Sequence, residues 1–229
     1  MERHLDEELK KLNTDLLMMA AKVEEAIHRS IEALKKRDKD MALKVIQDDE
    51  AIDEMEIKIE EEIIELLALF QPMAVDLRFI TTGMHINAGL ERIADLTVNI
   101  SQRVLDIADR EHLKPLVDIP KLADQAKSMV KKAIDAFVNK NERMAKEVIL
   151  SDRESNNLRT AVIRELIDDY MVKDGTTVPR AVPLLLITRD LERICDHAAA
   201  IAEDVIYMVR ARIIKHHRER LTAIDVQDE

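Results

Sequence analysis

The feature of this chain that most constrains its fold is an internal repeat. The segment MALKVIQDDEAID at residues 41–53 matches MAKEVILSDRESN at 144–156, and LERIADLTVNIS at 90–101 matches LERICDHAAAIA at 191–202. The two matches occur in the same order, with offsets of 103 and 101 residues. Such a pattern indicates a tandem duplication, so the chain is expected to fold as two related units.

Each unit has the composition of long amphipathic helices. The 229 residues include only three glycines and 2% aromatic side chains, against 47% hydrophobic and 35% charged residues. Sheet folds need more glycine-rich turns and more β-branched or aromatic residues than this, so they are excluded. Between Leu5 and Ala33 the apolar residues recur at alternating four- and three-residue steps, which is typical of a helix in a bundle.

The few helix breakers divide the chain. Pro72 ends one helical pattern, Pro115 and Pro120 bracket a short linker, and the loop DGTTVP occupies residues 174–179. The pattern predicts helices over residues 5–35, 40–70, 75–110, 121–138, 142–172 and 180–221. We therefore expect an all-α fold of two tandem, sequence-related three-helix bundles packed side by side, the first over residues 1–112 and the second over 113–229.

Charge and cysteine content narrow the class of protein. The formal net charge is −11, which disfavours nucleic acid as the main partner because phosphate backbones select basic surfaces. The single cysteine, Cys195, suits a reducing compartment and is expected to be a buried thiol. We find no apolar leader at the amino-terminal end and no uncharged stretch long enough to span a bilayer, so a cytoplasmic protein is expected.

Several carboxylates fall on helix faces that should point inward. On a helical wheel, Asp49, Asp53, Glu56 and Glu60 lie within an arc of about 60° that also contains Ala42. On the next predicted helix, Glu91 shares a face with apolar residues, and Asp95 and Asn99 follow at one-turn intervals.

The second unit repeats part of this pattern. Asp152 lies on an apolar stripe with Asn156 four residues later, and Glu192 is followed at the same spacing by Asp196. One position changes sign, because Arg159 stands where the first unit has Glu56.

Three explanations are open for like charges on one helix face, which repel unless something neutralises them. The acids could reach solvent at a bundle edge, they could pair with Arg or Lys from another helix, or they could bind a metal ion. Arg159 favours pairing in the second unit, whereas the first unit favours metal. A donor set of carboxylate and amide oxygens suits Mg²⁺, Ca²⁺, Mn²⁺ or iron better than a zinc–thiolate site.

The repeated LERI-x-D motif, with its Glu-x-x-x-Asp pairs and an upstream Asp-x-x-x-Asp or Asp-x-x-x-Asn, resembles the PhoU family over nearly the whole chain, from about Leu5 to Arg220. The resemblance implies a cytoplasmic, often dimeric, negative regulator of phosphate transport and of the phosphate-starvation response. Such a regulator would link a phosphate ABC transporter to a sensor histidine kinase and would bind multivalent metal ions, iron among them. The metal ligands that it implies here are Asp49, Asp53, Glu91, Asp95 and Asn99 in the first unit, and Asp152, Asn156, Glu192 and Asp196 in the second.

Other functions have weaker support in the sequence. No nucleotide-binding or hydrolase motif occurs, so an enzyme is not expected. A ferritin-like redox bundle would need Glu-x-x-His pairs, but Ala94 and Cys195 stand where the histidines would be. A helical scaffold without ligand and direct phosphate capture by Arg78 or Arg92 remain as further alternatives. The basic run at residues 210–220 either complements a helix end or docks on an acidic or lipid surface.

Overall fold

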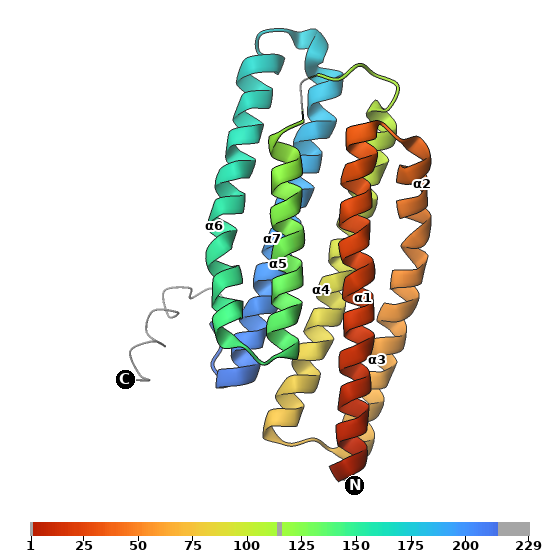
Figure 1. Ribbon diagram of the computed structural model, residues 1–229, viewed down its shortest axis with the longest axis vertical. Coiled ribbons are helices and arrows are strands. Elements are labelled where there is room, and N and C mark those ends of the chain that lie inside the picture. Colours follow the sequence, from red (N-terminus) through yellow and green to blue (C-terminus); the bar gives the residue numbers. More distant parts are fainter. Residues whose placement is uncertain (1, 114–115, 215–229) are drawn as a thin grey trace, which may run out of the picture.

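The computed structural model describes residues 2–113 and 116–214, and within them the protein is helical without strands (Figure 1). The first unit comprises α1 (Glu2–Lys36), α2 (Lys39–Asp48), α3 (Glu50–Phe70) and α4 (Ala74–Ile107). The second comprises α5 (Asp118–Val138), α6 (Glu142–Arg164), the π-helical turn η1 (Glu165–Met171), the short 3₁₀ turn η2 (Gly175–Thr177) and α7 (Val178–Arg210). Because α2 and α3 are separated only by Asp49, and η1 extends α6, each unit is a three-helix bundle as predicted.

The duplication extends to the turns that start the second helix of each unit. Asp38 caps α2 by accepting a hydrogen bond from the Met41 amide at 2.9 Å, and Asn141 caps α6 by accepting one from the Met144 amide at 3.1 Å. The residue before each cap, Arg37 or Lys140, has a positive φ, of 56° and 50° respectively. The offset between these matched positions is again 103 residues, so the repeated sequence produces a repeated turn.

The two units share one hydrophobic core. In Figure 1 the helices run nearly parallel or antiparallel along the long axis, with α4 and α7 packed together at the centre. Gly89 of α4 allows this approach, since a Cβ placed there would lie 3.3 Å from the Ile201 side chain of α7. Phe79 of α4 stacks on Phe137 of α5 with ring centroids 4.8 Å apart. The core is therefore continuous across both repeats. The division of the chain into two units between residues 112 and 113 stays a prediction drawn from the sequence repeat.

Two predicted helix ends are wrong. The last helix does not continue to Leu221, because α7 ends at Arg210 and Ala211 takes a left-handed conformation. The reason is tertiary packing, since Ile214 turns back and is 2% exposed. The third predicted helix stops at Ile107 instead of residue 110. Most of the basic run at 210–220 lies outside the described residues.

Candidate metal centre

The carboxylates predicted for the first site meet where α3 packs against α4. Asp49 lies in the break between α2 and α3 and is half-buried, as is Glu91 on α4. Asp53 and Asp95 are exposed, each one turn further along its helix. Asp53 and Asp95 are therefore less buried than the helical wheel predicts, because they lie along the edge of the α3–α4 interface rather than inside it.

The electrostatics show which acids the fold brings together. Burial raises the pKa of Asp49 to about 6, and the neighbouring charges of Asp53 and Asp95 add to that increase. Burial also raises the pKa of Glu91, with further contributions from Asp95, Glu56 and Asp53 that Arg92 only partly offsets. Carboxylates from two helices therefore act on one another, as the sequence predicted.

Two further residues flank this set. Burial, Glu60 and Asp53 raise the pKa of Glu56, in that order of effect. Asn99 lies one turn beyond Asp95 on α4, and its backbone carbonyl accepts a hydrogen bond from Arg103 Nη1 at 2.9 Å. The first set is thus an acidic strip along both helices.

The donor chemistry of the strip fits a hard cation, because every predicted ligand offers oxygen. The mutual repulsion of desolvated carboxylates would be relieved by a bound positive charge. As the side chains are placed, no group of three His, Cys, Asp or Glu residues within the described parts of the chain is arranged to hold an ion. Binding would therefore require the exposed Asp53 and Asp95 side chains to rotate toward Asp49, and the metal site stays a prediction.

The second set contains a cation of the protein itself. Arg159 Nε lies 3.6 Å from Glu192 Oε1, so the residue that replaces Glu56 pairs with a predicted metal ligand. Asp152 is 3% exposed and its backbone carbonyl accepts a hydrogen bond from Asn156 Nδ2 at 3.1 Å, while Asp196 is exposed. The second unit therefore shows the predicted pairing of an inward acid with an arginine. This pairing makes its acids less suited to binding a metal ion.

Cys195 lies among the acids of the second set and is a free, fully buried cysteine, as expected. Burial raises the pKa of its thiol to about 12, and Asp152, Asp196 and Glu192 act in the same direction against the Ser155 hydroxyl. The thiol is therefore protonated at neutral pH and is not a metal ligand in that state.

The structure also buries acids that the sequence analysis did not single out. Asp15, Glu62, Asp190 and Asp204 are all at most 8% exposed. A signal was available for Asp190, since it lies within about 40° of Ile194 on a helical wheel. Arg78, considered for phosphate capture, donates to the Met208 carbonyl at 3.1 Å and so contacts α7.

The raised pKa of Asp49 makes a prediction for the metal-free protein. A folded-state pKa of about 6, above the ordinary 3.8, means that stability is fully present below pH 3.8 and declines as pH rises through about 6. We expect Asp49→Asn to raise the free energy of unfolding at pH 7.5 by about 1 kcal/mol, a modest gain because solvent reaches the carboxyl. Urea denaturation in chelator at pH 7.5 and pH 4.5 measures this, and a gain that is larger at pH 4.5 would contradict it.

Comparison with known proteins identifies the family. The PhoU domain matches the chain twice, at residues 16–104 and 119–205. The chain is 34% identical over 221 residues to the phosphate-specific transport system accessory protein PhoU homolog 2 of Thermotoga maritima, covering 96% of this chain and 94% of that protein. It is 37% identical over 212 residues to the PhoU homolog of Aquifex aeolicus, covering 93% and 96%.

Solved structures agree with the sequence matches. The crystal structure of PhoU from Pseudomonas aeruginosa superposes with a TM-score of 0.87 at 33% identity, covering 90% of this chain and 99% of that one. PhoU from Streptococcus pneumoniae gives a TM-score of 0.85 at 28% identity, covering 91% and 98%. Within the described residues, no helix is both long and apolar enough to cross a membrane. The duplicated bundle, its repeated acid motifs and these matches show that the chain belongs to the PhoU family, a family of regulatory accessory proteins and not of enzymes.

Proposed function

We propose that this protein is a cytoplasmic negative regulator of phosphate uptake and of the phosphate-starvation response. The observation that carries the proposal is the double match to the PhoU domain, supported by relatives named as accessory proteins of phosphate-specific transport systems. The regulator acts by contacting a phosphate ABC transporter, through its ATPase subunit, and a sensor histidine kinase. It acts as a homodimer.

Capture and uptake measurements test this regulatory role. The tagged full-length protein is expected to retain the transporter ATPase or the sensor kinase of its own cell, identified by mass spectrometry. Deletion of its gene is expected to raise phosphate uptake in phosphate-replete medium. Failure to retain either protein, together with unchanged uptake, would overturn the proposal. Light scattering that shows only monomer at the assay concentration would contradict the proposed homodimer.

We further propose that the strip formed by Asp49, Asp53, Glu91 and Asp95, with Asn99 beside it, binds a multivalent cation such as iron, Mn²⁺, Mg²⁺ or Ca²⁺. The raised pKa values of Asp49 and Glu91 support this, because a cation would offset their desolvation and mutual repulsion. When bound, the ion supplies positive charge that joins α3 to α4. We expect weaker binding at Asp152, Asn156, Glu192 and Asp196, where Arg159 already pairs with Glu192.

Reversing the charge of Arg159 tests that difference between the units. Arg159→Glu removes the guanidinium that competes with a metal ion and places an acid where the first unit has Glu56, so it is expected to add about one equivalent of bound Mn²⁺ per chain. Electron paramagnetic resonance of free Mn²⁺ measures the stoichiometry. Arg153→Glu, an exposed change on the same helix, is the matched control. An equal gain in both variants would show that the added charge acts without forming a site.

A further inference from the structure

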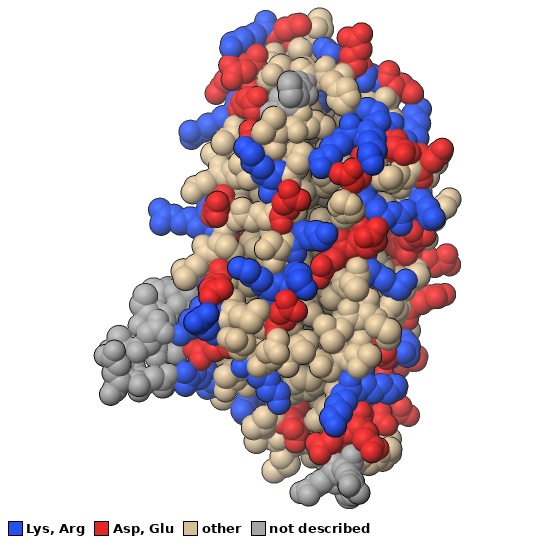
Figure 2. Space-filling model, in the orientation of Figure 1, with Lys and Arg blue, Asp and Glu red and all other residues tan. Residues whose placement is uncertain are grey.

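A small pocket lies at the end of the molecule where α1 begins and α3 ends. Its volume is about 140 Å³, and Figure 2 shows acidic side chains gathered at this end of the surface. This is below the roughly 300–1,000 Å³ of pockets that enclose metabolites, and it suits a single long side chain. The pocket is lined by His4, Glu8, Lys11, Glu62, Glu65, Leu66, Leu69 and Phe70.

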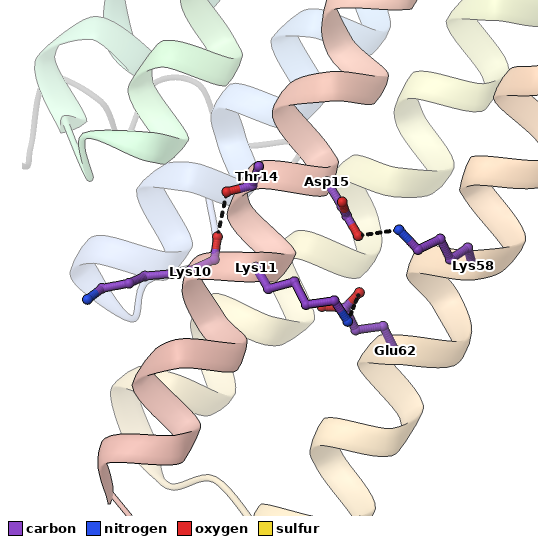
Figure 3. A network of polar contacts seen from close by, with 6 residues as sticks. All are labelled: Lys10, Lys11, Thr14, Asp15, Lys58 and Glu62. Atoms are coloured by element: carbon purple, nitrogen blue, oxygen red, sulfur yellow. Dashed lines mark hydrogen bonds and ion pairs between the residues drawn. The ribbon is translucent and has the colours of Figure 1, made fainter.

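Glu62 is the buried acid of this pocket. It is 8% exposed, and both carboxylate oxygens are buried without a hydrogen bond among the described residues. Its ion-pair partner is Lys11, whose Nζ lies 3.2 Å from Glu62 Oε2 but whose side chain is 55% exposed (Figure 3). A buried carboxylate without hydrogen bonds is costly, and a partly solvated ammonium compensates it weakly. Burial and the neighbouring Asp15 carboxyl raise the pKa of Glu62 against the effect of Lys11, so Lys11 alone does not offset the buried charge and a second cationic donor would stabilise it.

The second lysine near Glu62, Lys58, already forms an ion pair with another acid. Lys58 Nζ lies 2.8 Å from Asp15 Oδ2, one turn of α3 away from Glu62 (Figure 3). The pocket itself is thus lined by three carboxylates, Glu8, Glu62 and Glu65, and one ammonium, Lys11. Its net negative charge selects a cationic group.

The pocket walls distinguish between cations. Leu66, Leu69 and Phe70 form an apolar side, and His4 packs edge-on against Phe70 with ring centroids 5.7 Å apart. A hydrated metal ion gains nothing from such a wall. A guanidinium is planar, weakly hydrated, stacks on aromatic rings and donates paired hydrogen bonds to carboxylates.

An exposed apolar surface continues from the pocket around the turn between α3 and α4. Leu69, Met73, Val75 and Leu77 are 65%, 79%, 52% and 41% exposed. Apolar surface beside an acidic pocket is the complement of a segment that carries an arginine next to apolar residues.

We propose that this pocket receives an arginine side chain from a partner protein, whose adjoining apolar residues cover Leu69 and Met73. The guanidinium pairs with Glu62 and Glu65 and lies against Phe70, and it takes over part of the role of Lys11. The proposal adds a contact surface to the proposed regulatory function and rests on that function only for the partner's identity.

The test uses N-acetyl-arginine methylamide as the probe, titrated into methyl-labelled full-length protein and followed by NMR. We expect shifts concentrated in the methyl groups of Leu66 and Leu69, and much smaller shifts with the neutral citrulline analogue. The double variant Glu62→Gln, Glu65→Gln is expected to weaken binding about tenfold, since it removes charge-assisted hydrogen bonds. Glu61→Gln, an exposed change on the same helix outside the pocket, is the matched control.

The outcomes separate this proposal from the regulatory one, because the probe requires no partner protein. Equal shifts with the arginine and citrulline analogues would overturn the proposal that this pocket binds an arginine side chain. Equal binding by the double pocket variant and the Glu61→Gln variant would overturn it as well. Broadening of these methyl signals by Mn²⁺, without shifts from the arginine probe, would assign the pocket to a metal ion and also overturn the proposal. Should Glu62→Gln unfold the protein, Glu65→Gln and Leu69→Ala carry the same comparison at exposed positions.

Discussion

Replacing Phe137 with alanine is expected to lower the free energy of unfolding by about 3–5 kcal/mol, the usual cost of deleting a fully buried aromatic ring. Phe137 is 0% exposed, and its ring stacks on Phe79 at 4.8 Å with 17° between the planes. Phe79 belongs to α4 of the first unit and Phe137 to α5 of the second, so the lost contact joins the repeats. Few other aromatic rings exist in the chain to fill the cavity.

Urea denaturation followed by far-ultraviolet circular dichroism measures this loss. Phe137→Leu keeps most of the apolar volume and is expected to cost less than half as much as the alanine variant. Since the core is continuous, one cooperative transition is expected for the parent protein and for both variants. Two separate transitions in the parent protein, or an alanine variant within about 1 kcal/mol of the parent, would contradict the shared core.

Replacing Arg103 with alanine is expected to cost about 3 kcal/mol, because it removes the cation that does most to offset the burial of the Asp190 carboxylate. Arg103 Nε lies 3.8 Å from Asp190 Oδ2, across the packing of α4 on α7. Asp190 is 6% exposed, and burial raises the pKa of its carboxyl against the opposing effects of Arg103, Arg193 and Arg189. The expected cost is at the lower end for buried pairs, since the Arg103 side chain is 24% exposed.

A double-mutant cycle separates the interaction energy of Arg103 and Asp190 from the energy of the packing around them. Asp190→Asn alone is expected to cost less than Arg103→Ala, because the Arg103 guanidinium that it leaves is 24% exposed and still donates to the Asn99 carbonyl. The apolar pair Arg103→Met, Asp190→Leu should recover most of the lost stability, as replaced buried ion pairs often do. Chemical denaturation at pH 7 of the parent protein, Arg103→Ala, Asp190→Asn and the combined variant Arg103→Ala, Asp190→Asn provides the four free energies of the cycle. Strictly additive effects of the single changes would show that Arg103 and Asp190 do not interact.

The repeat allowed much of the fold to be predicted, because a duplicated sequence reproduces its own local structure. The matched caps at Asp38 and Asn141 show this most directly, as does the turn residue before each. The end of α7 could not be predicted in the same way. Ile213 and Ile214 extend the apolar pattern beyond Arg210, but Ile214 is buried by turning back toward α4, which a helix-period analysis does not detect.

For the candidate site, the sequence indicated which helix faces carry the acids but not how deeply each acid is buried. A helical wheel correctly brought Asp49 and Glu91 toward the same interface, and their raised pKa values follow from it. It could not show that Asp53 and Asp95 remain exposed, because exposure depends on which neighbour covers each helix edge. The pocket around Glu62 was missed for a related reason, since it depends on α1 lying beside the end of α3.

The two repeats differ in the charges of their candidate sites, since Asp53 and Glu56 of the first unit correspond to Asn156 and Arg159 of the second. In the first unit Glu56 adds to an acidic strip, whereas in the second Arg159 pairs with Glu192. We therefore expect the stronger cation site in the first unit.

The most direct test is the metal content of the protein purified without chelator, measured by inductively coupled plasma mass spectrometry. We predict bound multivalent metal in the parent protein, its loss in Asp49→Ala, Glu91→Ala, and its retention in the matched second-unit variant Asp152→Ala, Glu192→Ala. Circular dichroism confirms that each variant is folded. Equal metal content in the parent protein and the first-unit variant would contradict the assignment of the site to α3 and α4.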